Sequence, residues 1–417
     1  MYSPFIDEKG QPLSLNKVTY NHLEQLKECD EGHHLEFKSK LEDDWRAQLA
    51  KEIASFANCE GGWLIVGIDD KSKEISPIPK VDYSQKIGKI VARISPKPEF
   101  ETKFLSMPDN ESMGVLLVYV YEGKYAPYIC NGSIYVRSGS SKEPIKPAER
   151  GHVEYLLARS KAFQGEINDF FHREQLFSRD YANSEQNKYP IINIYIKNIS
   201  AKNDISLYTY EARDELIDFI RCQNNDFMRI EYSMDSVVFS QDNALLSNIS
   251  SVFELFYDWS CKIHVPVVSV SDWKMSELTS FFESIGISQF ASGLINVVNG
   301  TPIFSTVMVY LKLFSLTANQ YSLKENDYAI CVEVENLAKT TLTFAGKKYK
   351  DYVHGYGVPY PQRNHEKSDI FYLKDHPNIS FQNLVFDLIN DFLAPAFGYR
   401  SDSIQGICHA SFAEYRN

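Results

Sequence analysis

The stretch that decides the fold is Glu31-Gly32-His33-His34-Leu35-Glu36-Phe37-Lys38, followed after a helical pattern by Gly61-Gly62 and Trp63-Leu64-Ile65-Val66-Gly67-Ile68-Asp69-Asp70. In its first part, Leu35 and Phe37 alternate with Glu36 and Lys38, which predicts a short strand with one apolar face. In its last part, the run 63–68 is apolar without alternation. Such a run is typical of a central strand covered on both faces.

A helix is expected between these two strands. Trp45, Leu49, Ile53, Phe56 and Ala57 recur at helical spacing, and Asp43 or Asp44 can cap the start of the helix. The run 58–62, Asn-Cys-Glu-Gly-Gly, ends it, and its glycines can adopt the positive φ that a helix C-terminus feeding into a strand needs. Strand, helix and strand thus return the chain on itself.

This return brings carboxylates from both ends of the segment together. Glu31 and Glu36 lie at its start, and Asp69 and Asp70 lie at its end. Carboxylate oxygens are the expected ligands of Mg²⁺ or Mn²⁺, so three that converge form a candidate metal site. The alternative is that Glu36 and Lys38 form a surface ion pair while the two aspartates cap a turn.

Outward from this segment, the first part of the chain reads as an α/β domain with a mixed sheet, covering residues 1–162. Helices are expected at 17–28, 84–94 and 147–159, and further strands at 114–121 and 133–136. Residues 163–189 read as a helix followed by a polar linker. Residues 190–417 read as an α+β domain, with strands expected at 191–199, 227–239, 263–270, 302–316 and 329–334, and helices at 211–222, 275–285 and 382–393.

The charge and the cysteine content exclude several classes of protein. The chain has 417 residues and a net charge of −12, which argues against non-specific coating of nucleic acid, because affinity for phosphate is built from Lys and Arg. Residues 71–97 are locally basic.

The seven cysteines are scattered without a Cys-x-x-Cys pair, so neither a disulfide framework nor a zinc ribbon fits. With no signal-peptide profile at the start and no apolar run of membrane-spanning length, we expect a cytoplasmic protein without membrane contact.

Four motifs occur in a defined order: 31–38, 56–62 (Phe-Ala-Asn-Cys-Glu-Gly-Gly), 67–70 (Gly-Ile-Asp-Asp) and 134–141 (Ile-Tyr-Val-Arg-Ser-Gly-Ser-Ser). Together they resemble the Schlafen-type AlbA domain, known from Schlafen proteins and from many bacterial and archaeal DNA-binding proteins. The resemblance ends before about residue 165. It differs from the common family pattern in one visible place, since Gly32 stands where Ser usually follows the first Glu.

The resemblance implies nucleic-acid binding and, as in the Schlafen ribonucleases, metal-dependent cleavage of structured RNA such as tRNA. By motif position, Glu31, Glu36 and Asp69 would be the catalytic residues that hold Mg²⁺ or Mn²⁺. Lys38, on the same strand face as Glu36, would then hold the scissile phosphate or its developing charge. RNA is the favoured partner and DNA the other, with homo-oligomer formation also open.

Residues for binding the phosphate backbone follow from the last motif and from the basic stretch. The loop after Val136 offers a guanidinium, hydroxyls and backbone N–H groups, and the helix at 84–94 offers further cations. The predicted set is Arg137, Ser138, Ser140, Ser141, Lys142, Lys86, Lys89 and Arg93. The alternatives are an ordinary polar turn and a solvated helix face.

Two functions remain open at this stage. One is the endoribonuclease; the other is a DNA- or RNA-binding regulator that does not cut and whose second half is a sensor or dimerisation domain. His33 and His34 could act in acid–base chemistry, although an exposed or hydrogen-bonded histidine is more common. The chain has no Gly-x-x-x-x-Gly-Lys-Ser/Thr loop and no Ser-centred nucleophile elbow, so neither an ATPase nor a serine hydrolase is supported.

Overall fold

The computed structural model describes residues 2–40, 46–138, 145–173, 189–200, 207, 209–224, 226–227, 229–242, 250–267, 280, 283, 296–338, 340–344, 347–375 and 388–400. Within it the chain divides into two compact units. The first unit comprises Met1–Asn168 with Ser200–Asp204, and the second comprises Asp169–Ile199 with Ile205–Asn417.

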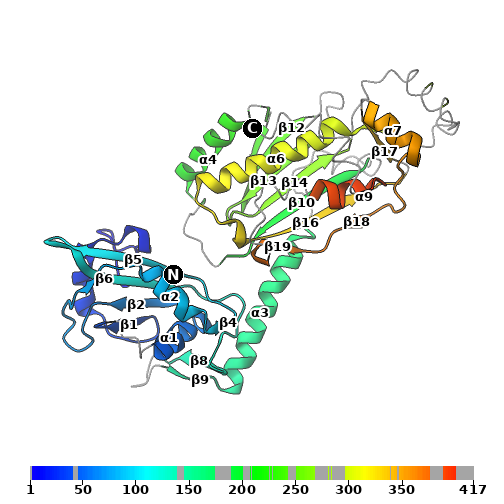
Figure 1. Cartoon of the computed structure of the whole chain (residues 1–417). Coiled ribbons are helices and arrows are strands. Elements are labelled where there is room, and N and C mark those ends of the chain that lie inside the picture. Colours follow the sequence, from blue (N-terminus) through cyan, green and yellow to red (C-terminus); the bar gives the residue numbers. More distant parts are fainter. Residues whose placement is uncertain are drawn as a thin grey trace. The chain divides into compact units, whose positions relative to one another are not determined.

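The first unit is built on a mixed five-stranded sheet (Figure 1). Its strands are β1 (Leu35–Lys38), β2 (Gly62–Val66), β3 (Ile78–Pro79), β5 (Phe100–Met107) and β6 (Asn110–Val120). They run in the order β1-β2-β6-β3, with β5 also paired to β6. Strand β1 is parallel to β2 and all the other pairs are antiparallel, so the predicted mixed-sheet α/β fold is confirmed.

Both faces of this sheet are covered, as the apolar run at 63–68 predicts. Leu64 and Val66 pack against helices α1 (Arg46–Asn58) and α2 (Tyr83–Val91). Trp63 and Ile65 point the other way, to the N-terminal segment with its 3₁₀ helices η1 (Leu15–Lys17) and η2 (Tyr20–Glu28). The helix expected at 17–28 is present mostly as the 3₁₀ helix η2. The caps expected at Asp43 and Asp44 lie outside the described residues.

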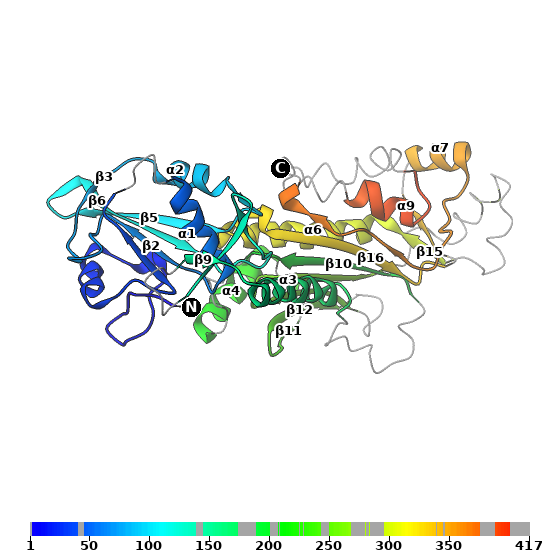
Figure 2. The ribbon, with the colours of Figure 1, turned by 90° about the horizontal axis from the view of Figure 1, so that it is seen from below.

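A second, four-stranded sheet packs on α1. It contains β4 (Ile94–Ser95), β7 (Ile129–Cys130), β8 (Ser133–Arg137) and β9 (Ile145–Pro147), and helix α3 (Arg150–Phe170) follows it. The last strand of the sheet, β9, lies close to α1 in both Figure 1 and Figure 2. Asn58, at the end of α1, donates to the carbonyls of Tyr128 and Tyr135, at 2.8 and 2.9 Å. These bonds hold β7 and β8 against the point where the helix ends.

The second unit is an eight-stranded antiparallel sheet with helices packed into its apolar core. Its strands are β10 (Ile191–Asn198), β11 (Arg229–Tyr232), β12 (Ser236–Asp242), β13 (Ser250–Phe256), β14 (Cys261–Pro266), β16 (Tyr328–Glu335), β18 (Glu366–Lys367) and β19 (Phe371–Tyr372). Strands β15 (Asn296–Asn299) and β17 (Thr340–Thr343) form a separate parallel pair. The other elements are α4 (Tyr210–Gln223), α6 (Gly300–Gln320), η7 (Glu325–Asp327), α7 (Lys347–Tyr356), η8 (Leu373–Asp375), a π-helical turn at Ile389–Leu393 and α9 (Ala394–Ala396).

Two predictions for this unit are wrong. The run 302–316, expected as a strand, lies in α6, where burial recurs at helical spacing, for example at Phe304, Val307 and Leu311. An apolar run of this length without alternation fits a buried helix better than a strand. The expected strand at 227–239 is instead the hairpin of β11 and β12, since the chain turns between Tyr232 and Ser236.

Helix α6 also corrects the expectation about membrane-spanning length. In the described part of the chain it is the one helix long and apolar enough to cross a membrane, judged by length and composition. Most of it is buried, and its side chains belong to the core of the second unit. That packing is typical of the core helix of a globular domain. The helix expected at 275–285 lies almost entirely outside the described residues.

Candidate functional site

The predicted site residues Glu36 and Lys38 lie on β1, which the β2 ladder holds in register. Leu35 pairs with Trp63 and Lys38 with Val66. Leu35 and Phe37 point into the apolar core, as their alternation predicts. The opposite face is covered as well, so that Glu36 is only 5% exposed. A charged side chain so deeply buried needs partners of opposite charge.

Glu36 has two such partners. One of its carboxylate oxygens accepts a hydrogen bond from the Lys38 ammonium, and the other accepts from Arg137 Nη2 at 2.8 Å. Lys38 also forms an ion pair with Glu52 of α1, at 3.3 Å. We call these four side chains, Glu36, Lys38, Glu52 and Arg137, the internal ion network. It contains two acids and two bases.

Arg137 links the end of β8 to the start of β1. Its Nε and Nη2 donate to the Gly32 carbonyl at 2.9 and 2.7 Å, and its guanidinium lies over the Phe56 ring, 4.2 Å from the centroid. The side chain is completely buried. Arg137 therefore holds the protein's own backbone and Glu36, whereas the sequence predicts contact with a nucleic-acid phosphate. To contact a phosphate group in solvent, the Arg137 side chain would have to leave this buried position.

Glu52 is a member of the network that sequence reasoning missed. Burial, together with the neighbouring charge of Glu36, raises the pKa of its carboxyl to about 7, although the Lys38 ammonium opposes the shift. The sequence does carry a signal for it. Glu52 follows Leu49 by three residues and precedes Phe56 by four, so it lies within the apolar stripe of α1. An acid in that stripe has to be paired or protonated.

Glu31 lies close to this network but binds the backbone. Its Oε1 accepts a hydrogen bond from the Phe37 N–H at 2.7 Å. Burial raises the pKa of its carboxyl despite that hydrogen bond, and the charges of Glu36 and Asp70 raise it further. The charges of Glu36 and Asp70 thus both act on the Glu31 carboxyl.

Asp69 accepts hydrogen bonds within the turn that it begins. Its Oδ1 accepts from the backbone N–H groups of Lys71 and Ser72, at 3.1 and 2.9 Å, and from the Ser72 hydroxyl at 3.1 Å. These bonds, those from Ser72 first, lower the pKa of Asp69. Asp70 approaches Lys73 instead, at 3.5 Å. The alternative weighed from the sequence, a turn cap at the end of the strand, describes this geometry.

The predicted ligands Glu31, Glu36 and Asp69 do not fit a Mg²⁺ or Mn²⁺ ion in this arrangement. Within the described residues they do not form a group whose donor atoms all lie within 4.8 Å of one another. Both oxygens of Glu36 are already bound by cations, and Asp69 is bound by its turn. An ion held by these three carboxylates would need Glu36 to leave Lys38 or Arg137.

The predicted basic residues of α2 are available to solvent. Lys86, Lys89 and Arg93 are exposed, and in the part of the chain that the structure describes none of them forms an ion pair. Their spacing of three and four residues places them on one side of the helix and its C-terminal turn. We call Lys86, Lys89 and Arg93 the basic face.

The loop after β8 begins at Ser138. Ser138 is partly exposed at its start. Ser140, Ser141 and Lys142 lie outside the described residues, so their predicted contacts with phosphate stay predictions.

Two comparisons with known proteins give a match to part of this chain. A solved structure, the DIP2311 protein from Corynebacterium diphtheriae, is similar over 31% of this chain with 24% sequence identity and a TM-score of 0.24. The matched part spans about a quarter of that protein, 24% of its chain. The family model described as Schlafen, AlbA_2 matches residues 31–146, which include β1, the internal ion network and the basic face. That family is one of nucleic-acid-binding domains. The N-terminal part of this chain is therefore a Schlafen-type AlbA_2 domain.

Proposed function

We propose that the first unit binds nucleic acid, with RNA favoured, and that the basic face makes the contacts with the phosphate backbone. The observation that carries the proposal is the exposure of Lys86 and Lys89 on α2 and of Arg93 just after it, inside a domain of the Schlafen AlbA_2 family. Within the described residues none of the three pairs with an acid, so each keeps its charge for a ligand, and Lys86 Nζ lies over the Tyr83 ring, 5.4 Å from the centroid. Arg137 and Lys38 instead form ion pairs with Glu36 and Glu52, respectively.

The charge distribution supports recognition of the backbone at one place. With a net charge of −12, most of the surface repels a polyanion, so a small cationic region decides where nucleic acid can approach. Contacts with phosphate position the nucleic acid without reading its sequence. RNA is favoured because its folded shapes and 2′-hydroxyls can be recognised without a large basic surface.

Binding of labelled tRNA, single-stranded DNA and double-stranded DNA to the full chain tests this proposal. The variant Lys86→Ala/Lys89→Ala/Arg93→Ala is expected to lose most of the affinity. The control Lys9→Ala/Lys17→Ala/Lys71→Ala removes three exposed lysines of the same unit and is expected to bind like wild type. Equal affinity of both variants, or no binding by wild type at low salt, would refute the proposal.

The second candidate is the metal-dependent endoribonuclease that the sequence resemblance implies. The observation in its favour is that Glu31 lies close enough to Glu36, Asp70 and Lys38 for the first two to raise and the third to lower the pKa of its carboxyl. The geometry does not favour this function, because both carboxylate oxygens of Glu36 already bind internal cations, Lys38 and Arg137. Binding without cutting is therefore the function that the geometry supports better, and cleavage with Mg²⁺ or Mn²⁺ is the one to test beside it.

The cleavage assay compares tRNA incubated with Mn²⁺, with Mg²⁺ and with EDTA. If the endoribonuclease proposal holds, cleavage is lost with EDTA and in Glu31→Gln, Glu36→Gln and Asp69→Asn, while tRNA binding is retained. Asp109→Asn, an exposed acid in the β5–β6 turn, is the control and should cut like wild type. Intact tRNA under every metal condition, with binding retained, would leave the binding module as the function.

A further inference from the structure

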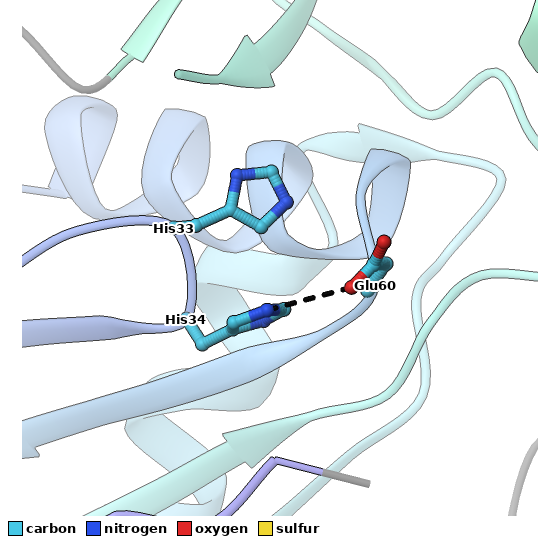
Figure 3. A group of neighbouring side chains, drawn as sticks. All are labelled: His33, His34 and Glu60. Atoms are coloured by element: carbon cyan, nitrogen blue, oxygen red, sulfur yellow. Dashed lines mark ion pairs between the residues drawn. The ribbon is translucent and has the colours of Figure 1, made fainter. Parts of the chain in front are cut away.

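A second group of potential metal ligands lies beside the internal ion network. His33 and His34 occupy the segment that leads into β1, and Glu60 follows the end of α1 (Figure 3). One potential ligand atom from each residue lies within 4.8 Å of the others. Within the described residues, these are the three histidine, cysteine or acidic side chains whose potential ligand atoms come this close together. The predicted metal residues Glu31, Glu36 and Asp69 have no part in it.

The orientation of the His34 ring is informative. Its Nδ1 lies 3.2 Å from the Gly61 carbonyl oxygen, and its Nε2 lies 3.4 Å from Glu60 Oε2. Both neighbours are acceptors, whereas a neutral imidazole carries a single N–H. When Nδ1–H donates to the carbonyl, the lone pair of Nε2 faces the carboxylate. Either a second proton or a metal cation between Nε2 and Oε2 resolves that conflict.

The spacing fits a zinc ion. In tetrahedral sites Zn²⁺ lies about 2.0–2.1 Å from histidine nitrogen and carboxylate oxygen, which puts two such ligand atoms about 3.3 Å apart. The observed separation of His34 Nε2 and Glu60 Oε2 is 3.4 Å. Metal-binding histidines commonly donate their other N–H to a backbone carbonyl, which sets the tautomer and the ring orientation. The Gly61 carbonyl is in position to do this for His34.

The backbone around the group is rigidly held. The His34 carbonyl accepts the Trp63 N–H at 2.8 Å, and Gly61 turns the chain with φ at +78°. A side chain at Gly62 would collide with Phe56 and the His34 carbonyl, so the two segments approach as closely as glycine allows. The Tyr2 ring stacks on His34, with centroids 4.9 Å apart. These contacts bring Glu60 to His34 before any ion binds.

His33 completes the donor set. Its ring contributes one nitrogen to the group, within 4.8 Å of the potential ligand atoms of His34 and Glu60. A neutral imidazole keeps a lone pair for a metal ion. The rings of His33 and His34 lie nearly perpendicular (Figure 3). Their centroids are 4.7 Å apart.

We propose that His33, His34 and Glu60 bind a zinc ion, with three protein ligands and a fourth position open to water. Two imidazoles and one carboxylate form a donor set that suits Zn²⁺, whereas Mg²⁺ and Mn²⁺ prefer oxygen ligands alone. The ion would join the start of β1 to the turn between α1 and β2. This inference is independent of whether the first unit binds or cuts nucleic acid, since it concerns metal binding by the protein alone.

Isothermal titration of the chelator-treated full chain with Zn²⁺ tests the proposal. Wild type is expected to bind one equivalent and to gain thermal stability on binding. Glu60→Gln and His34→Gln should each weaken zinc binding by at least about tenfold. The Glu60 side chain is 71% exposed, so Glu60→Gln is expected to fold normally. His354→Gln replaces an exposed histidine of α7 and should bind zinc like wild type.

Cobalt gives a second measurement of the same site. Co²⁺ in place of Zn²⁺ is expected to produce the intense visible absorption of four-coordinate cobalt in wild type and to lose it in Glu60→Gln. Absence of zinc binding by wild type would overturn the proposal. So would zinc binding of unchanged stoichiometry and affinity in both Glu60→Gln and His34→Gln, because the ion would then be held by other residues.

Discussion

Glu36 divides its two carboxylate oxygens between Lys38 and Arg137, and this single residue explains much of the candidate site's chemistry. Removing one partner of a buried ion pair costs far more than the pair contributes, because the remaining charge stays desolvated. Arg137 also binds the Gly32 carbonyl through two nitrogens. Lysine cannot reproduce this forked contact.

Arg137→Ala is therefore expected to destabilise the first unit by about 3–5 kcal/mol. Arg137→Lys should be intermediate, since it keeps the charge and loses the fork. Hydrogen exchange of peptides covering β1, measured on the full chain, reports the loss locally. The control is Arg150→Ala, which breaks an exposed pair with Glu154 and should cost less than about 1 kcal/mol. Similar exchange rates for Arg137→Ala and Arg150→Ala would contradict the structural role of Arg137.

Glu52 makes stability depend on pH. Its pKa rises from the ordinary 4.5 to about 7 on folding, chiefly because the carboxyl is buried. The folded state then binds the proton more tightly than the unfolded state. The resulting stabilisation is complete below about pH 4.5 and is lost as the pH rises through about 7.

Compared with Glu52→Gln, which carries no titrating group at this position, wild type is expected to lose stability between about pH 5 and pH 8. The measurement is the urea midpoint of both proteins across this range, together with the carboxyl resonances of glutamate-labelled protein. A resonance titrating near pH 7 should be missing from Glu52→Gln. The exposed control Glu111→Gln should retain that resonance. Parallel stability profiles of wild type and Glu52→Gln would show that Glu52 is not the titrating group.

At the scale of elements, the turn from α1 into β2 places the site residues. Gly61 has a positive φ, and Gly62 lies so close to Phe56 that an added Cβ would come within 2.2 Å of the ring. The helix can therefore end and the central strand begin within a few residues. That tight connection brings the end of α1 next to the segment leading into β1.

Gly62→Ala is expected to destabilise the protein by about 1–3 kcal/mol, the usual cost of forcing extra volume into a packed core. Gly88→Ala is the matched control, because Gly88 lies in α2 with nothing within 4 Å of an added Cβ. That substitution should stabilise by about 0.4–1 kcal/mol through the loss of backbone freedom in the unfolded chain. Urea unfolding followed by circular dichroism measures both changes. Equal effects of the same sign would show that the α1–β2 turn is not tightly packed.

At the scale of the whole molecule, the chain has a net charge of −12, whereas the basic face of the first unit consists of three residues. A protein that coats nucleic acid through many cations shows a steep dependence of affinity on salt. A protein that binds through a few cations shows a shallow one. The acidic remainder of the surface adds no favourable contacts with phosphate.

The full chain is therefore expected to show a slope of about −2 to −3 in log affinity against log salt, corresponding to the three cations of the basic face at about 0.7–0.9 per phosphate contact. Lys86→Ala, measured alone, should reduce the magnitude of the slope by about 1. Titrations of labelled tRNA at several salt concentrations give both values. A slope much steeper than this would mean that a larger surface takes part, and a slope unaffected by Lys86→Ala would remove Lys86 from it.

The sequence by itself determined the local elements of the first unit. The alternation in 35–38, the helical spacing in 46–57 and the unbroken apolar run in 63–68 predict β1, α1 and β2 with both faces of the sheet covered. These patterns are local consequences of side-chain direction in strands and helices, so a single sequence carries them. The same patterns failed at α6, because an apolar run buried on several sides lacks the alternation that separates helix from strand.

Only the tertiary structure decided what the charged residues do. Arg137 lies about a hundred residues from Glu36 along the chain, and the packing of β8 on α1 brings the two within 2.8 Å. Sequence spacing does not show that such an arginine is buried, or that Asp69 binds its own turn while Glu60 meets His34. The partners and burial of a charge depend on contacts between distant segments, and these two properties determine whether a charge is available to a ligand.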